Sequence, residues 1–207
     1  MSREYSPTRK YELKKRADQM ADTHRRITEA AIELHGSLGP SRTTLSAVAE
    51  RAGVERRTLY RHFPNEGKLF EACSAHYFTA NPWPRLGAWR AIRDPQERLE
   101  RALDELYAYY ERTEPMLSNV LRDAEVVEFA RDAVAPLHAY LDEAAETLIA
   151  GRQVRGRRRE LMRSALRHAL AFSTWRSLAA NEIRSPDAVR LVAALVEAAG
   201  RADGRLP

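Results

Sequence analysis

Apolar residues recur with helical spacing along almost the whole chain after residue 23. Ile27, Ala31, Leu34 and Leu38 are separated by four, three and four residues, which places them on one face of a helix. Sustained alternation of apolar and polar residues, which is typical of a half-buried strand, is nearly absent. The pattern therefore predicts an all-α fold.

Glycine and proline residues divide this pattern into separate helices. Gly39-Pro40 ends the first helix, Thr44 is the expected N-cap of a short second helix, and Gly53 supplies a tight turn before a third. The segment between 81 and 95 is expected to be irregular. Besides the short second helix after Thr44, the predicted helices cover residues 23–38, 55–62, 66–78, 96–112, 114–122, 126–150, 157–181 and 186–200.

The two short helices on either side of Gly53 meet the physical requirements of a helix-turn-helix. The turn between them is tight, and the residues available to pack them together are small or branched: Val48, Ala49, Ala52, Val54 and Leu59. The outer face of the second helix can then present side chains to a DNA groove. That face carries Glu55, Arg56, Arg57, Thr58, Tyr60, Arg61 and His62.

Two sequence runs within this region resemble the DNA-binding signature of the TetR family of repressors. They are TLSAVAERAGV at residues 44–54 and TLYRHFPN at residues 58–65. The resemblance is specific over roughly residues 23–78, and beyond them it consists of a similar number and length of helices. It implies an all-helical homodimer whose third helix enters the major groove, and which a small inducer, bound in the C-terminal domain, releases from DNA.

The resemblance implies phosphate contacts for several residues of this chain. Thr44 matches such a position at the start of the second helix, and Tyr60 and His62 match positions that hold the phosphate backbone. Arg61 is either a phosphate contact or a solvated charge. On the residues alone, Tyr60 could instead pack in the core and His62 could cap the third helix.

The resemblance also implies residues that read bases, and this chain departs from the family's pattern at one position. Arg56 and Arg57 match positions that read base edges, because arginine can donate two hydrogen bonds to guanine. Thr58 matches a position where a hydroxyl or methyl group meets a base or a phosphate. The family usually has lysine where this chain has Glu66, and a carboxylate there suits the helix dipole but not a phosphate. Lys68 is the nearest substitute.

Positive charge is concentrated toward the N-terminus. Residues 1–75 contain 14 Lys and Arg against 10 Asp and Glu, a net charge of +4, whereas the whole chain has +5. We therefore expect a basic, flexible tail over residues 1–22, a helix-turn-helix domain over 23–78, and a helical regulatory and dimerisation domain over 79–207. The tail is either a DNA-contacting arm or a solubilising segment.

The last two predicted helices are the candidates for a dimer interface. Helix 157–181 has two adjacent apolar stripes and helix 186–200 has a third, which is more apolar surface than a single helix face needs. Two such hairpins could form a four-helix interface around a two-fold axis, although both stripes could instead be monomer core. The candidate interface residues are Leu161, Ala165, Ala169, Leu191 and Leu195.

Aromatic and flexible apolar residues of the C-terminal region could line an effector pocket. Pockets in helical domains lie between helices and are mostly apolar with a few polar anchors, which the tyrosine hydroxyls could supply. Ordinary core packing is the alternative for each residue. The candidates are Leu103, Tyr107, Tyr110, Met116, Val120, Phe172 and Trp175, and together they favour an apolar or aromatic ligand.

Sequence signs of catalysis are weak. The six histidines show no metal-ligand spacing, and the chain has neither a glycine-rich phosphate loop nor a nucleophile motif. The single cysteine, Cys73, is expected to be a buried structural thiol. We therefore expect a protein that is not an enzyme and needs no cofactor or metal. An enzyme or an interaction protein that keeps a vestigial helix-turn-helix remains the alternative.

The composition is compatible with a cytoplasmic regulator. One cysteine excludes a disulfide framework, and no apolar run reaches the roughly 20 residues that span a bilayer, so no membrane partner is expected. The expected partners are an operator in double-stranded DNA, a small-molecule effector and a second copy of the chain. DNA binding with a steep salt dependence would distinguish a regulator from the alternatives.

Overall fold

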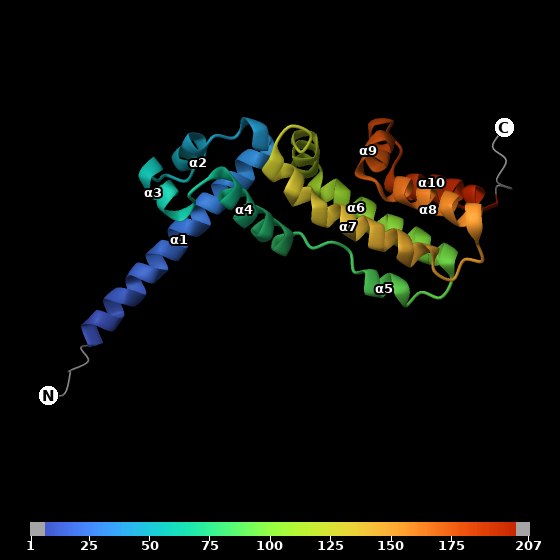
Figure 1. The fold of residues 1–207 in the computed structure, drawn as a ribbon, viewed down its shortest axis with the longest axis horizontal. Coiled ribbons are helices and arrows are strands. Elements are labelled where there is room, and N and C mark those ends of the chain that lie inside the picture. Colours follow the sequence, from blue (N-terminus) through green and yellow to red (C-terminus); the bar gives the residue numbers. More distant parts are fainter. Residues whose placement is uncertain (1–6, 202–207) are drawn as a thin grey trace. The chain divides into compact units, whose positions relative to one another are not determined.

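The computed structural model describes residues 7–201, with side chains from residue 11 onward. Its regular elements over these residues are all helices, each too short or too polar to span a bilayer, so the predicted all-α fold is confirmed (Figure 1). In chain order they are α1 (Pro7–Ser37), the 3-10 helix η1 (Pro40–Arg42), α2 (Leu45–Arg51), α3 (Arg56–His62), α4 (Glu66–Ala80), α5 (Leu86–Arg90), α6 (Pro95–Asp123), α7 (Glu128–Ile149), α8 (Gly156–Leu170), α9 (Phe172–Ala180) and α10 (Ser185–Arg201).

The chain forms two compact units. The first contains the residues up to 80 together with 118–133, and the second contains 81–117 and the residues from 134 onward. The C-terminal end of α6 and the N-terminal end of α7 therefore belong to the first unit, although most of each helix belongs to the second. The division of the chain into functional domains at residue 78 stays a prediction.

The first helix is longer than its apolar stripe indicated. α1 begins at Pro7 rather than near residue 23, so residues 7–22 belong to a helix and not to a separate tail. Residues 1–6, including Arg3, lie outside the described residues. The physical reason is that no glycine or proline occurs between Pro7 and Gly36, and strong helix formers such as lysine, glutamate and alanine occupy much of that stretch.

The core of the first unit lies where α1, α2, α3 and α4 meet. Ile27, Val48 and Leu59, one from each of the first three helices, have no exposed surface. Cys73 of α4 is buried in the same cluster, and its thiol donates to the carbonyl of Thr28 at 3.6 Å. Burial raises the pKa of the Cys73 thiol to about 12, so the group is neutral and unreactive, as predicted.

The C-terminal end of α6 holds the chain that precedes α2. The amide of Asn119 donates to the carbonyl of Gly36 at 2.8 Å, and the Asp123 carboxylate accepts from the backbone N–H of Ser41 at 2.8 Å. Burial raises the pKa of Asp123, but hydrogen bonds from Arg122 and Ser41 outweigh burial and lower it overall. Asp123 is therefore a buried carboxylate that stays ionised and fixes η1.

α6 continues through a proline that was expected to divide it. The predicted helices 96–112 and 114–122 are one helix, with Pro115 inside it. An interior proline costs about 3 kcal/mol. Pro115 itself is exposed, while Leu106, Tyr110 and Leu117 of the same helix are buried. Burial of such side chains contributes about 1.5–3 kcal/mol each, which is enough to keep the helix continuous.

The predicted helix 157–181 is instead two helices. α8 ends at Leu170, and Ala171 is extended with φ −68° and ψ 138° before α9 begins. The break leaves the carbonyls of Ala169 and Leu170 without helical partners. The hydroxyl of Tyr107 donates to the first at 2.9 Å, and that of Tyr110 donates to the second at 2.7 Å. Two tyrosines about 60 residues earlier in the chain thus stabilise the break.

The segment expected to be irregular contains the short helix α5 and is tied to its own unit by two aromatic residues. The Trp89 indole has no exposed surface and donates to the Glu105 carboxylate at 2.8 Å. The Tyr140 hydroxyl of α7 donates to the carbonyl of Pro84 at 3.1 Å. These bonds satisfy polar groups that burial would otherwise leave unpaired.

The buried His35 makes the stability of the first unit dependent on pH. Burial is the main cause that lowers the pKa of His35 from 6.5 to about 4, against a smaller opposing effect of Asp123. The folded state therefore holds His35 neutral at pH values where the unfolded chain would protonate it. The contribution of His35 to the free energy of unfolding is complete above pH 6.5 and is lost as the pH falls toward 4. We expect His35→Gln to reduce the loss of unfolding free energy between pH 7 and pH 4 by roughly 3 kcal/mol, measured by urea unfolding.

The control for this prediction is His138→Gln, which changes an exposed histidine of α7. It should leave the pH dependence of the wild type in place. Equal pH dependences for the wild type and His35→Gln would contradict the prediction.

Candidate nucleic-acid interface

The start of α2 is fixed by Thr44. Its side-chain oxygen accepts a hydrogen bond from the backbone N–H of Ala47 at 3.1 Å, which is the N-cap role predicted for it. The hydroxyl hydrogen is not used in that bond, and the residue is exposed. A threonine hydroxyl can accept one bond and donate another, so the cap is compatible with donation to a phosphate. The phosphate contact itself stays a prediction.

The turn between α2 and α3 has the geometry of a helix C-cap with a left-handed glycine. Gly53 has φ +63°, its N–H donates to the carbonyl of Glu50 at 3.0 Å, and the N–H of Val54 donates to the carbonyl of Ala49 at 3.0 Å. The guanidinium of Arg26 in α1 donates to the carbonyls of Ala52 and Gly53. Sequence reasoning found the glycine but missed Arg26, which gives no local signal of this contact.

α3 buries one side and exposes the other. Leu59 is completely buried and Phe63, just after the helix, is 3% exposed, so both anchor the helix in the core of the unit. The exposed side chains of α3 are Arg56, Arg57, Tyr60 and Arg61, while Thr58 and His62 are half-buried. The structure therefore brings Arg56, Arg57, Tyr60 and Arg61 onto an accessible, positively charged face, whereas Thr58 and His62 lie at its edge.

Two residues of this exposed face contact each other. The guanidinium of Arg56 donates to the Tyr60 hydroxyl at 3.2 Å and lies 5.6 Å from the centre of its ring. The residues are four apart, one helical turn, which allows this contact. The pairing reduces the number of conformations open to this exposed arginine. Tyr60 is 40% exposed, so it lies on the surface rather than in the core.

His62 lies where α3 meets α1. Its ring centroid is 6.1 Å from that of His24, and the ring of His24 lies 4.6 Å from that of Phe63. Burial, and to a smaller extent the nearby charges of Arg61 and His24, lower the pKa of His62. A neutral imidazole is therefore favoured. Its Nε2 is buried with no hydrogen-bond partner among the described residues, so a bond from this ring to a phosphate would have to come from Nδ1.

Glu66, where this chain departs from the family pattern, and the nearby Lys68 both lie at the start of α4. Glu66 lies in the first turn of α4, where a carboxylate complements the helix dipole. Asn65 accepts a bond from the backbone N–H of Lys68 at 2.9 Å, and the Lys68 ammonium pairs with Glu71 at 2.7 Å. Lys68 is exposed but already has an anionic partner, which must be exchanged if it is to bind a phosphate.

Comparison with known proteins identifies this domain. Residues 27–73 match the family model described as "Bacterial regulatory proteins, tetR family". The N-terminal domain of this chain is therefore a TetR-family DNA-binding domain. The match includes α2, the turn at Gly53 and all of α3.

Individual relatives agree with this assignment. The chain is 33% identical over 85 residues to the HTH-type transcriptional regulator SrpR of Pseudomonas putida, covering 38% of this chain and 40% of SrpR. It is 26% identical over 134 residues to the nucleoid occlusion factor SlmA of Vibrio cholerae serotype O1, covering 62% and 67%. The chain thus matches only about two fifths of the length of SrpR.

Solved structures show the same fold over more of the chain. A TetR-like transcriptional regulator from Rhodococcus sp. RHA1 superposes with a TM-score of 0.62 at 20% identity, covering 84% of this chain and 93% of that protein. At this identity the likeness establishes the fold alone, an N-terminal helix-turn-helix followed by a helical C-terminal region.

The predicted effector residues occupy different surroundings. Tyr107, Tyr110, Phe172 and Trp175 form one buried aromatic cluster, with centroid separations of 5.3 Å for Tyr110–Phe172 and 5.4 Å for Phe172–Trp175. Leu103 is buried on the same helix as the two tyrosines, whereas Met116 is half-buried and Val120 belongs to the first unit. Their role in ligand binding stays a prediction.

The predicted dimer residues also divide by exposure. Leu191 and Leu195 of α10 are exposed, and they line an apolar groove of about 410 Å³ together with Ala165 and Ala169 of α8. Ala169 is 1% exposed and Leu161 is half-buried outside the residues that line this groove. The exposure of Leu191 and Leu195 in the single chain is the observation that most favours the predicted dimer interface.

The left-handed turn should not tolerate a side chain. We expect Gly53→Ala to lower the free energy of unfolding by about 1–2 kcal/mol, since a Cβ is disfavoured at φ +63°. That atom would also lie 3.1 Å from the guanidinium of Arg26. Urea unfolding would measure the effect.

Gly87→Ala is the matched control, because a Cβ at this position in α5 would meet no atom within 4 Å. This change should be neutral or stabilising by a few tenths of a kcal/mol. If both alanine variants behaved alike, the conformation of Gly53 would not be the cause.

Proposed function

We propose that this chain is a ligand-responsive transcriptional repressor that binds a pseudo-palindromic operator as a homodimer. A small, apolar or aromatic effector releases it from DNA. The observation that carries the proposal is the exposed cationic face of α3 within a TetR-family helix-turn-helix. Arg56, Arg57 and Arg61 are all exposed there, on a helix anchored from behind by Leu59.

The proposed contacts are of two kinds: contacts to phosphates, which position the protein on the duplex, and contacts to base edges, which read the sequence. Thr44, Tyr60 and His62 provide hydroxyl and imidazole donors for phosphates at the two ends of the motif, which fixes the register of α3 on the duplex. Arg56 and Arg57 lie at the N-terminal end of α3, from which recognition helices reach base edges in the major groove. An arginine that donates two bonds to guanine contributes about 1–3 kcal/mol of base discrimination.

The groove between α8 and α10 supports homodimerisation. Leu195 is 61% exposed and Leu191 is 44% exposed, which is unusual for leucines on a helix whose other face is packed. In a two-fold assembly the same surface of each copy would cover that of the other. Dimerisation would place two recognition helices about one DNA turn apart, roughly 34–36 Å, which matches a pseudo-palindromic operator.

The aromatic cluster of the second unit supports an apolar or aromatic effector. Tyr110, Phe172 and Trp175 pack on one another, and the hydroxyls of Tyr107 and Tyr110 bond to α8. An effector that enters between these rings would contact their apolar surfaces. It would also compete with the backbone carbonyls of α8 for the tyrosine hydroxyls. It releases DNA only to the extent that it binds the non-DNA-binding conformation more tightly.

The remaining parts of the proposal follow from the family. The chain's relatives include transcriptional regulators, and we propose that it likewise acts without catalysis, in the cytoplasm, and with DNA, an effector and a second copy as its partners. Selection of bound duplexes from random DNA is the direct test. A pseudo-palindromic product supports the proposal, and the absence of any selected sequence would overturn it.

Arg57 should be required for specific binding. We expect Arg57→Ala to weaken binding to the selected operator by about 5- to 150-fold for each half-site, which corresponds to the 1–3 kcal/mol of one bidentate contact in each half-site. The variant should keep its unfolding free energy, because the side chain is exposed. Fluorescence anisotropy with labelled operator would measure the change.

Arg93→Ala is the control for Arg57→Ala, since it removes an equally exposed charge from the second unit. Its operator affinity should equal that of the wild type. Unchanged affinity in Arg57→Ala would reject the assignment of this residue to base reading.

Leu195 should be required for assembly. We expect Leu195→Arg to raise the dissociation constant of the dimer at least about tenfold, since an unpaired charge would be buried at the interface. Sedimentation equilibrium would measure it. Val126→Arg changes a residue that is 77% exposed in the first unit and should leave assembly intact. Equal dissociation constants for both variants would place the interface elsewhere.

A further inference from the structure

The N-terminal half of α1 extends beyond the packed core of the first unit (Figure 1). All side chains from residue 11 to residue 22 are exposed, including Tyr11, Leu13 and Met20 at 56% or more. A helix of this length without tertiary packing is only marginally stable in water. Its continuity with the packed half of α1 supports it, and a binding partner would fix it further.

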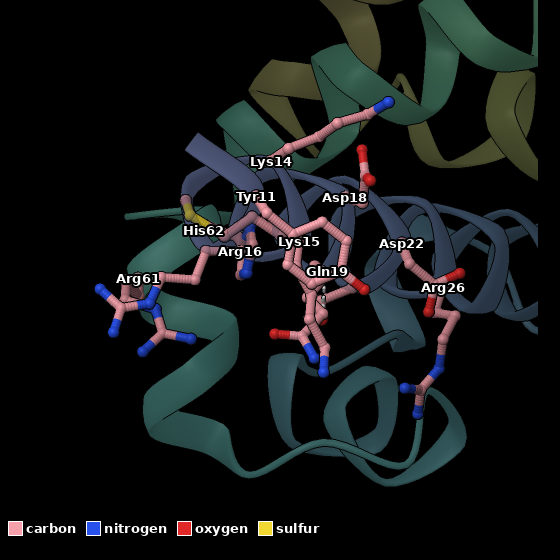
Figure 2. Close-up of a pocket in the computed structure, with 12 residues that line it drawn as sticks. Tyr11, Lys14, Lys15, Arg16, Asp18, Gln19, Asp22, Arg26, Arg61 and His62 are labelled. Atoms are coloured by element: carbon pink, nitrogen blue, oxygen red, sulfur yellow. Dashed lines mark hydrogen bonds between the residues drawn. The ribbon is translucent and has the colours of Figure 1, made fainter. Parts of the chain in front are cut away.

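This half of α1 and the end of α3 line one groove of about 1150 Å³. Lys15 and Gln19 lie on the side of α1 that faces α2 and α3, whereas Lys14 extends from the other side (Figure 2). Arg61 and His62 of α3 line the same groove. The groove is therefore continuous with the face of α3 that carries the candidate DNA contacts.

The groove is positively charged. Its lining includes five lysines and arginines but only two aspartates. One of these, Asp22, already pairs with Arg25 at 2.7 Å, outside the groove. Lys14, Lys15 and Arg16 make no ion pair within the part of the chain whose side chains are described. Three adjacent cations with no anionic partner among the described side chains favour an anionic ligand.

We propose that this α1–α3 groove binds the sugar-phosphate backbone of DNA that flanks the half-site contacted by α3. The inference rests on the proposed function, because the same duplex would occupy both surfaces. The segment from Tyr11 to Arg26 is about 22 Å long at 1.5 Å per residue, enough to follow several phosphates. Lysines on flexible stems suit phosphates, which they bind as point charges without reading bases.

The test compares two duplexes with one set of variants. The first duplex is the operator selected from random DNA and trimmed to its half-sites, and the second carries about one extra helical turn on each side. The wild type should bind the extended duplex more tightly and with a steeper salt dependence. Each phosphate contact contributes about 0.9 to the slope of log K against log salt concentration.

The neutralised variant carries Lys14→Ala, Lys15→Ala and Arg16→Ala together. It should bind the trimmed duplex as the wild type does, and it should lose the gain in affinity and slope on the extended duplex. Arg155→Ala, Arg157→Ala and Arg158→Ala combined are the matched control, because they remove the same charge from the second unit. The control should keep the full gain.

Ala17→Pro tests the helix without changing charge. Ala17 is exposed in the middle of the extended segment, and proline there interrupts the helix. We expect this variant to lose the gain on the extended duplex. If it keeps the gain, a basic tail of any conformation is enough and the groove is not the binding site.

The outcomes separate this inference from the proposed function. A wild type that binds no duplex overturns the proposed function. A wild type that binds both duplexes equally, or a neutralised variant that matches it on the extended duplex, overturns the groove alone. Equal weakening of the neutralised variant on both duplexes also overturns it, since the contacts would then lie within the half-site.

Discussion

The position of α3 depends on the left-handed turn at Gly53. Two backbone hydrogen bonds close the end of α2 there, and the guanidinium of Arg26 binds the carbonyls that the turn leaves open. The turn directs Leu59 and Phe63 into the core against α1. The opposite side of α3 is thereby exposed, and its arginines are accessible because the apolar residues of the same short helix are buried.

α6 carries residues that stabilise both units. Tyr107 and Tyr110 bond to the end of α8, whereas Asn119 and Asp123 near its C-terminus bond to the chain between α1 and α2. In the proposed regulator, an effector must favour one of two conformations to change DNA affinity. The hydrogen bonds of α6 reach the aromatic cluster in the second unit and the chain that precedes α2 in the first.

Local sequence signals were sufficient for the elements that depend on neighbouring residues. The N-cap at Thr44, the turn at Gly53 and the alternation of buried and exposed side chains on α3 follow from side-chain chemistry within a few residues. The same signals misplaced other boundaries. Pro115 did not break α6, and Ala171, a residue with no helix-breaking character, separates α8 from α9.

The sequence by itself determined the all-helical class, the helix-turn-helix and the residues of its outer face, because these arise from helical periodicity, capping and turn chemistry. Only the tertiary structure decided which distant groups complete them. Arg26 at the turn, Asp123 at η1 and the tyrosines that bond to Ala169 and Leu170 act across 26 to 82 residues of chain. Such pairings depend on which buried polar groups lack a local partner, and that is settled only when the helices pack.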